Sequence, residues 1–300
     1  MEKTENQNRD DIIDICKRVH ANGWVASNDG NVSIRTGPNT VLCTPTGMSK
    51  GYLTSGQLIK VDMQGNKLDG ALEPSSEIKM HIDVYKHKEG VNSVVHAHPP
   101  YATGFAVAGV PLDECVMPEI IIGLGSIPLT KFGTPSTMEI PENIRPFLKQ
   151  YSVFLLENHG ALSVGNDVFQ AYYRMESLEL FAKISFVARS LGNVNVLDEN
   201  TAKKVIKVRE YFNLPTEDYP GCRVNDRFVT SAEGIELNAQ TAVKGSIGTG
   251  GFAQGSSLFT SGPAAGSPGN IPGENISISK EKLVELVTIV VSSIIKNYKP

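Results

Sequence analysis

Two histidines one residue apart, His96 and His98, close a β-branched run that is typical of a strand. Side chains two residues apart on a strand point to the same face, so both imidazoles are expected to project together. A third histidine, His159, follows the apolar run at residues 153–156, where a strand would turn into a loop before Gly160. A fold that brings these three histidines together would leave an open coordination position, as in catalytic zinc sites.

A His-x-His pattern by itself is more often a pair of packed or hydrogen-bonded histidines than a metal site, because neutral imidazole is easily buried. Other features of the sequence favour the metal-site interpretation of His96 and His98. The chain has only six histidines, and Glu77 precedes the pair by one predicted helix, over residues 76–88. The serines Ser75 and Ser76 can cap this helix, and its free amides can also bind a phosphate.

Five motifs, in order along the chain, resemble those of the class II aldolase and epimerase family. They are Asn28-Asp29-Gly30-Asn31-Val32-Ser33, Thr44-Pro45-Thr46-Gly47, Pro74-Ser75-Ser76-Glu77, His96-Ala97-His98-Pro99 and Glu157-Asn158-His159-Gly160. The resemblance spans residues 10–215. It implies an α/β fold of three layers, α/β/α, with a central, mainly antiparallel sheet flanked by helices and followed here by a flexible C-terminal extension.

The resemblance also implies a function and a cofactor. The expected reaction is the reversible, metal-dependent cleavage of a ketose 1-phosphate, such as fuculose or rhamnulose 1-phosphate, to dihydroxyacetone phosphate and lactaldehyde. One Zn²⁺ per chain would be held by His96, His98 and His159, with Glu77 as the general acid/base. The expected phosphate- and substrate-binding residues are Asn28, Asn31, Thr46, Gly47, Ser75 and Ser76.

One departure from the family pattern concerns a second proton relay. Fuculose phosphate aldolase uses a tyrosine from a neighbouring subunit, and the matching region at residues 115–119 has none. Glu119 could substitute, or Tyr211 or Tyr219 could reach the site. The alternatives therefore stay open: a ribulose-5-phosphate 4-epimerase, a related sugar-phosphate dehydratase or, in a different class, a non-catalytic scaffold domain.

Composition narrows the possible partners and compartment. The formal net charge of -4 argues against nucleic-acid binding, and no apolar run reaches the ~20 residues of a membrane span. The polar N-terminus does not resemble a signal peptide. The four cysteines, Cys16, Cys43, Cys115 and Cys222, have no paired spacing, which favours free thiols in a reducing cytosol. We therefore expect a cytoplasmic enzyme of small sugar phosphates.

Three local predictions can be compared with the structure. Asp10 or Asp11 is expected to cap a first helix, and residues 116–122 are a strand candidate. Asp167 is expected to cap a long helix to about residue 191. Its apolar stripe is predicted to face the core, and consists of Phe169, Tyr172 or Tyr173, Leu180, Ile184 and Val187.

The C-terminal third differs in character. The predicted organisation is a catalytic domain over residues 1–220, a Gly/Ser/Pro-rich linker over residues 221–275 and an amphipathic helix over residues 276–300. Such a helix resembles the peptides that direct enzymes into bacterial microcompartments by binding shell or cargo proteins, but it could also dock on its own core. The family resemblance further implies a homotetramer with the metal site near a subunit boundary.

Overall fold

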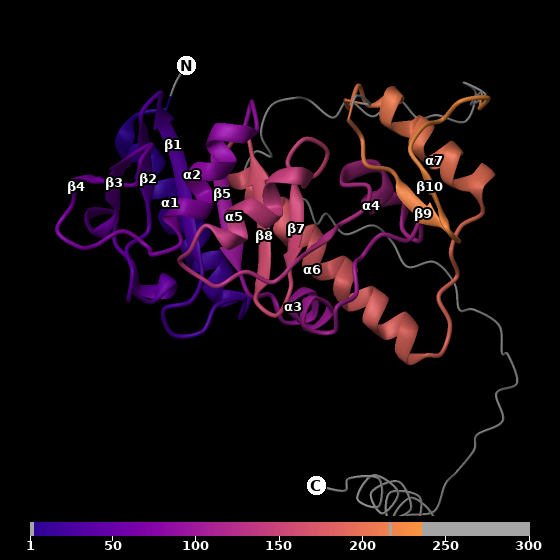
Figure 1. Cartoon of the computed structure of the whole chain (residues 1–300), viewed down its shortest axis with the longest axis horizontal. Coiled ribbons are helices and arrows are strands. Elements are labelled where there is room, and N and C mark those ends of the chain that lie inside the picture. The colour runs from indigo at the N-terminus through magenta and orange to yellow at the C-terminus, as the bar shows by residue number, and fades with distance from the viewer. Residues whose placement is uncertain (1–2, 216–217, 236–300) are drawn as a thin grey trace, which may run out of the picture. The chain divides into compact units, whose positions relative to one another are not determined.

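An eight-stranded sheet forms the centre of the structure, a computed structural model that describes residues 3–215 and 218–235. The strands lie in the order β4-β3-β2-β1-β5-β8-β7-β6 (Figure 1). Neighbouring strands are antiparallel, except for β6 and β7, which pair in parallel. The bounds are β1 Asn31–Gly37, β2 Thr40–Cys43, β3 Ile59–Asp62, β4 Lys67–Asp69, β5 Ser93–Ala97, β6 Leu129–Thr130, β7 Val153–Leu156 and β8 Gly160–Gly165.

Helices cover both faces of this sheet. One face packs against α1 (Glu5–Ala21), α3 (Pro100–Val107) and α6 (Val168–Ser190), and the other against α2 (Ile78–His87) and α5 (Glu139–Ile144). Adjacent residues of β5 show why this strand is buried throughout. Val95 packs in the core on the side of α1, α3 and α6, Val94 packs in the core on the side of α2 and α5, and both are fully buried. The predicted three-layer α/β/α architecture is confirmed.

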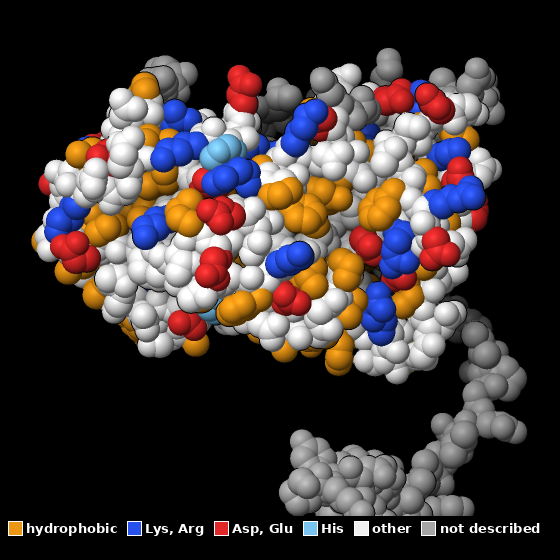
Figure 2. Space-filling view, viewed as in Figure 1, with side chains coloured by type: hydrophobic (Ala, Val, Ile, Leu, Met, Phe, Trp, Pro, Cys, Tyr) orange, Lys and Arg blue, Asp and Glu red, His pale blue; other side chains and the backbone are white. Residues whose placement is uncertain are grey.

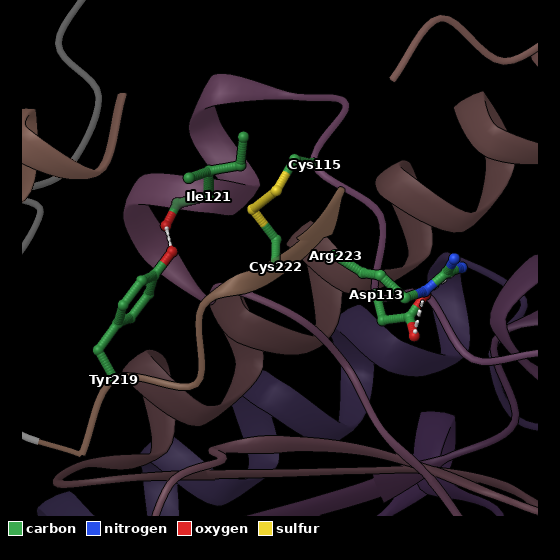
Figure 3. Close-up of a disulfide and its surroundings, with 6 residues drawn as sticks. All are labelled: Asp113, Cys115, Ile121, Tyr219, Cys222 and Arg223. Carbon is green, nitrogen blue, oxygen red and sulfur yellow. Dashed lines mark hydrogen bonds and ion pairs between the residues drawn. A yellow bond between two sulfur atoms is a disulfide. The ribbon is translucent and has the colours of Figure 1, made fainter. Parts of the chain in front are cut away.

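A smaller unit of structure packs beside these layers. It contains α4 (Pro118–Gly123), α7 (Glu199–Tyr211) and the hairpin of β9 (Cys222–Val224) and β10 (Arg227–Val229), which share a buried cluster (Figure 1). The prediction that all four cysteines are free thiols is wrong for two of them, because Cys115 and Cys222 form a disulfide (Figure 3). They are 107 residues apart in sequence, so only the fold reveals that their Cα atoms lie 5.1 Å apart.

The disulfide is supported by polar contacts on both sides. Arg223 donates from Nε and Nη2 to the two carboxylate oxygens of Asp113, each at 3.0 Å, and the Tyr219 hydroxyl donates to the Ile121 carbonyl at 2.5 Å (Figure 3). Cys16 and Cys43 are free and buried, as predicted. With one pair oxidised, cysteine usage no longer argues for a reducing compartment.

Two local predictions are corrected. The first helix begins after Thr4, not at Asp10 or Asp11, because Thr4 and Gln7 form a reciprocal capping box nearer the N-terminus. The stretch predicted as a strand at residues 116–122 contains α4 instead. Pro118 occupies its first turn, where a missing N–H and a fixed φ favour a helix start over a strand interior.

The long helix α6 is capped by Asp167 as predicted, but its predicted core stripe is largely exposed. Leu180, Ile184 and Val187 are 55%, 40% and 49% exposed. The buried face is offset around the helix and consists of Val168, Ala171, Tyr172, Met175, Leu178, Phe181, Ala182 and Ser185. Apolar residues occur on more than one face, so periodicity could not tell which face meets the sheet.

The predicted boundary at residue 220 falls inside the fold. Strands β9 and β10 lie within the stretch predicted as linker, and the disulfide attaches them to the rest of the chain. The remaining linker and the terminal helix fall in residues 236–300, outside the described residues. No helix among those described is long and apolar enough to cross a membrane. Acidic and basic side chains are intermixed over the face seen in Figure 2, with no basic field there.

Candidate active site

Three histidines, two at the end of β5 and one in the β7–β8 hairpin, meet at one end of the sheet. His96 lies in β5, paired with Leu162 of β8, and His98 follows directly after the strand. His159 sits in the tight turn between β7 and β8. The ring centroids of the three imidazoles are 4.8–5.2 Å apart, and one nitrogen of each lies within 4.8 Å of the others. The structure therefore brings together all three predicted metal ligands.

Gly160 makes this approach possible. A Cβ placed there would lie 2.5 Å from Cδ2 of His98 and 2.7 Å from the carbonyl oxygen of Ala97. Real Cβ atoms do not make contacts this short, so only a residue without a side chain fits between the hairpin and His98. The neighbouring Asn158 has a φ of 54°, in the left-handed region that tight turns use. Close packing thus requires Gly160, and the left-handed backbone at position 158 favours asparagine.

The imidazoles are set up as neutral donors of lone pairs. His96 Nδ1 lies 2.9 Å from the Ala161 carbonyl, which can only accept, so Nδ1 carries the proton and Nε2 is a bare acceptor. Burial lowers the pKa of His96 to about 4 and also lowers that of His159. The buried Nε2 atoms of His96 and His98 have no hydrogen-bond partner. This donor set fits a divalent ion, which needs unprotonated imidazole nitrogens.

Glu77 lies against two of these histidines at the start of α2. Its Oε2 accepts a hydrogen bond from Asn31 Nδ2 at 2.7 Å and lies 3.4 Å from His96 Nε2, while Oε1 lies 3.4 Å from His159 Nε2. Burial alone would raise the pKa of Glu77, but the two imidazoles and Asn31 outweigh it and lower the pKa overall. Glu77 is therefore a carboxylate at neutral pH, with the buried Oε1 free of hydrogen bonds.

A second group of buried polar side chains, those of His81, Ser33 and Tyr85, lies next to the Glu77–Asn31 pair. One helical turn along α2, the buried His81 shares a hydrogen bond of 2.7 Å between its Nδ1 and Ser33 Oγ, which also contacts the Tyr85 hydroxyl at 2.6 Å. Asn31 and Ser33 are two residues apart on β1, so they pair side by side with Glu77 and His81. Burial lowers the pKa of His81 to about 3, which keeps this imidazole neutral.

A cavity of about 210 Å³ opens beside Glu77, His98 and His159. Its volume is below the ~300–1,000 Å³ typical of drug-sized ligand sites, which suits a small polar ligand. It is lined by all six predicted phosphate- and substrate-binding residues: Asn28, Asn31, Thr46, Gly47, Ser75 and Ser76.

Backbone hydrogen bonds hold two of the cavity walls together. Thr46 N donates to the Glu73 carbonyl at 2.9 Å, and Ser75 N donates to the Thr44 carbonyl at 3.2 Å. These two bonds fix the Thr46-Gly47 loop against the segment that leads into α2. The side-chain hydroxyls of Thr46, Ser75 and Ser76 thereby gather along one part of the cavity, where they can act as hydrogen-bond donors.

The cavity is also lined by residues for which the sequence predicted no role. Lys50, Pro135 and Ser136 lie outside the five motifs, whereas Asp29, Gly30 and Pro45 lie inside them. Asp29 Oδ2 lies 3.6 Å from His98 Nδ1, and Ser136, with a φ of 68°, donates from its hydroxyl to Ser76 Oγ at 2.8 Å. Asp29 lies inside a motif that was recognised, but no local pattern connects residues 135–136 or Lys50 with the site.

The three candidates for a second proton relay do not line this cavity in the described chain. Tyr219 is buried in the separate cluster around the disulfide, where its hydroxyl is bonded to Ile121. Glu119 and Tyr211 are exposed. Within one chain, Glu77 and Asp29 are the carboxylates described at the cavity.

Comparison with known proteins agrees with this geometry. Residues 10–186 match the sequence profile described as Class II Aldolase and Adducin N-terminal domain. A Methanococcus maripaludis protein, "L-fuculose phosphate aldolase", is 33% identical over 181 residues, covering 60% of this chain and 97% of the relative. A Pectobacterium atrosepticum protein, "3-oxo-tetronate 4-phosphate decarboxylase", is 27% identical over 188 residues, covering 61% of this chain and 86% of the relative. The crystal structure of a putative aldolase/epimerase/decarboxylase from Klebsiella pneumoniae has a TM-score of 0.62 at 29% identity, covering 69% of this chain and all of that one.

Proposed function

This chain belongs to the class II aldolase and adducin N-terminal domain family, and on that premise we propose that it is a zinc-dependent lyase that cleaves a carbon–carbon bond in a small sugar phosphate. One observation carries the proposal: within a cluster of three histidines, His96 and His98 have buried Nε2 atoms without a hydrogen-bond partner, and that of His96 lies 3.4 Å from the Glu77 carboxylate. A scaffold domain would have no need to bury such groups unpaired, because each costs free energy to desolvate.

The first candidate reaction is the reversible cleavage of a 6-deoxyketose 1-phosphate to dihydroxyacetone phosphate and lactaldehyde. Relatives named as L-fuculose phosphate aldolases support this choice, as does a cavity with a phosphate-binding end next to the histidines. Ser75, Ser76, Thr46 and Gly47 would bind the phosphate, while Asn28 and Asn31 would contact the phosphate or substrate hydroxyls.

The chain's own residues have separate roles in this reaction. A divalent ion held by His96, His98 and His159 would supply Lewis-acid stabilisation of negative charge on substrate oxygens. In the condensation direction, the Glu77 carboxylate removes a proton from the hydroxymethyl carbon of dihydroxyacetone phosphate and returns it during cleavage. Glu77 is ionised at neutral pH, as a base must be before it accepts a proton, and the hydrogen bond from Asn31 holds the carboxylate in place.

A second candidate reaction is decarboxylation of a 3-oxo-tetronate 4-phosphate, and a specific observation favours it. Aldol cleavage must also remove the proton of the hydroxyl on the departing carbon, and Glu119, Tyr211 and Tyr219 do not line the cavity in the described chain. Decarboxylation breaks the bond between carbons 1 and 2, releases CO₂ and needs only a proton delivered to carbon 2. Relatives named as such decarboxylases match with 27–31% identity.

One set of assays separates the candidates. The zinc-loaded protein is incubated with fuculose, rhamnulose and ribulose phosphates and with 3-oxo-tetronate 4-phosphate. Release of dihydroxyacetone phosphate with an aldehyde identifies an aldolase, and release with CO₂ a decarboxylase. Conversion of ribulose 5-phosphate to its 4-epimer identifies an epimerase, and loss of water a dehydratase. If none of these four sugar-phosphate substrates is turned over, the proposed function is refuted.

The metal is tested by elemental analysis of the purified protein. We expect about one zinc per chain, because three neutral imidazoles with an open position suit this ion. Alanine variants of His96, His98 and His159 should each lose the ion. Full metal content in all three variants would show that the ligands lie elsewhere.

We also propose that the protein is a homotetramer. The exposed apolar side chains of α6, including Leu180, Ile184 and Val187, support a covered face in the assembly. A tetramer would place a residue from a neighbouring copy near each site, as the missing proton relay requires. Sedimentation at micromolar concentration should show a tetramer, and a monomer alone would refute this.

The role proposed for the C-terminal extension rests on sequence, because residues 276–300 lie outside the described structure. We propose that they bind microcompartment shell or cargo proteins, where a lumen would retain a reactive aldehyde. A fusion of these residues to a fluorescent protein should form foci when shell proteins are co-expressed. A truncation after residue 235 keeps Cys222 and β10 and should retain activity in free solution. Diffuse fluorescence, or an inactive truncation, would contradict this role.

A further inference from the structure

Lys50 is an unusual residue because it is a lysine in the protein interior. Its side chain is among the largest that are fully buried, with 2% of the residue exposed. Lysine is almost never buried to this extent unless its charge is paired, because removing an ammonium group from water is costly. Among the residues described along the cavity, Lys50 is the sole lysine or arginine.

Hydrogen bonds place the Lys50 ammonium group between two walls of the cavity. Nζ donates to the carbonyl of Asn28 at 2.8 Å and to that of Met48 at 2.9 Å. Asn28 begins one substrate-binding motif, and Met48 follows directly after Gly47 in another. An ammonium group has three N–H donors, so one remains for a ligand.

The backbone that carries Lys50 is fixed by close packing. Lys50 begins a short 3₁₀ helix, Lys50–Tyr52, that lies against α1. A Cβ at Gly51 would lie 2.5 Å from Nδ1 of His20, so this turn sits directly on the His20 ring. Lys50 therefore cannot move its charge out to solvent without disturbing α1.

The charged side chains along the cavity indicate how Lys50 would affect the binding of an anion. The acidic side chains described there are those of Asp29 and Glu77, and both face the same cavity as Lys50. Burial lowers the pKa of Lys50, and the neighbouring Cys16, Asp29 and Glu77 act in the opposite direction. A phosphate dianion entering between two carboxylates would be repelled unless a fixed cation offsets them.

We propose that Lys50 is a specificity-determining residue that selects a dianionic phosphate ester, by presenting a fixed positive charge and by joining the Asn28 and Gly47 loops around it. This rests on the proposed function only in taking a phosphate ester as the ligand. The opposing interpretation is that Lys50 merely links two loops, with no electrostatic contribution to binding.

The test compares two probes of similar shape and different charge. Methyl phosphate is mainly a dianion at pH 8, because the second pKa of a phosphate ester is about 6, whereas methyl sulfate is a monoanion. Binding of each to the metal-loaded protein is measured by titration calorimetry. We expect methyl phosphate to bind at least about tenfold more tightly, as a charge-assisted hydrogen bond supplies.

The variant Lys50→Met keeps the length of the side chain and removes the charge. We expect its preference for methyl phosphate over methyl sulfate to fall to about unity, with affinity for methyl phosphate reduced about tenfold or more. Lys86→Met is the matched control, because it removes the same charge from an exposed position on α2 and should keep the preference. If Lys50→Met does not fold, Lys50→Gln serves instead, since its amide can still donate to the two carbonyls.

Each outcome decides the question. An unchanged preference in the Lys50 variant, or an equal loss of both probes, would overturn the proposal and leave Lys50 as a link between loops. Absence of any preference in the wild-type protein would overturn it as well. Because neither probe is turned over, the result is independent of whether the enzyme proves to be an aldolase or a decarboxylase.

Discussion

Substitution of Gly160 by alanine should damage the metal site while leaving the fold intact. The new Cβ would lie 2.7 Å from the Ala97 carbonyl oxygen and 2.5 Å from Cδ2 of His98. Relief to ordinary van der Waals separation requires displacements of roughly 0.5–1 Å. The Ala97 oxygen belongs to the β5–β8 ladder and resists movement, so the His98 ring and the turn carrying His159 should move instead.

The expected loss of metal affinity can be estimated from the range of ligand distances that a metal site tolerates. Ligand distances in such sites hold within about 0.2 Å, so a displacement of this size takes at least one imidazole out of range. Disturbing ligand orientation typically lowers metal affinity about 10–100-fold, which corresponds to roughly 1.4–2.7 kcal/mol. Overpacking should also lower the free energy of unfolding by about 1–3 kcal/mol.

The assay is competition for zinc against a chromogenic chelator, together with urea unfolding of the metal-free protein. Gly104→Ala is the matched control, because Gly104 lies exposed in α3 and the added methyl group would have no neighbouring atom within 4 Å. This control should stabilise the helix by about 0.5–1 kcal/mol without affecting zinc. Zinc affinity within twofold of wild type in Gly160→Ala would refute the claim that this close approach positions the ligands.

Three further results are expected. Glu77→Gln should retain zinc but lose turnover by about 10²-fold or more, and near-normal turnover would move the proton transfer to another group. Cys222→Ser should lower the free energy of unfolding in urea by up to about 5 kcal/mol, the loop-closure value for a separation of 107 residues, and an unchanged midpoint would show that the disulfide does not constrain the unfolded chain. The pKa of His81 is lowered to about 3 in the fold against an ordinary value near 6.5, so the unfolded chain binds more protons between these values and stability should fall as pH drops through that window. Urea midpoints between pH 7 and pH 4 should show a smaller fall for His81→Gln than for wild type, and equal falls would exclude His81 as a cause.

The centre of the site could be predicted because its signals are local. His96 and His98 follow from strand alternation, and Ser75, Ser76 and Glu77 from the start of a helix. The prediction of His159 as a ligand assumed that the strand carrying His96 would lie beside the hairpin carrying His159. The pairing of β5 with β8 satisfies this assumption. Each of these motifs carries its chemistry within a few residues, so the residue types alone were informative.

Lys50 and Ser136 were not predicted. Lys50 follows the Thr44–Gly47 motif by three residues but lies outside it, and no motif in the sequence includes Ser136. Lys50 enters the cavity because a 3₁₀ turn packs against α1, and Ser136 because the loop before α5 reaches Ser76. Both contacts join segments that are far apart in the chain. The exposure of Leu180 could not be predicted for a related reason. Helix α6 carries apolar residues on more than one face, and only packing against the sheet selects the face that is buried.

The sequence by itself determined the three histidines with Glu77 and the polar residues Ser75 and Ser76, because strand alternation and helix-start chemistry act over a few residues, while its ordered motifs implied the layer architecture through the family resemblance. Tertiary structure alone decided that Cys115 meets Cys222, that Lys50 is buried with its charge and that Gly160 must lack a side chain. Those outcomes depend on distances between segments separated by tens to about a hundred residues. Such distances are set by how complete elements pack, and no short stretch of sequence encodes them.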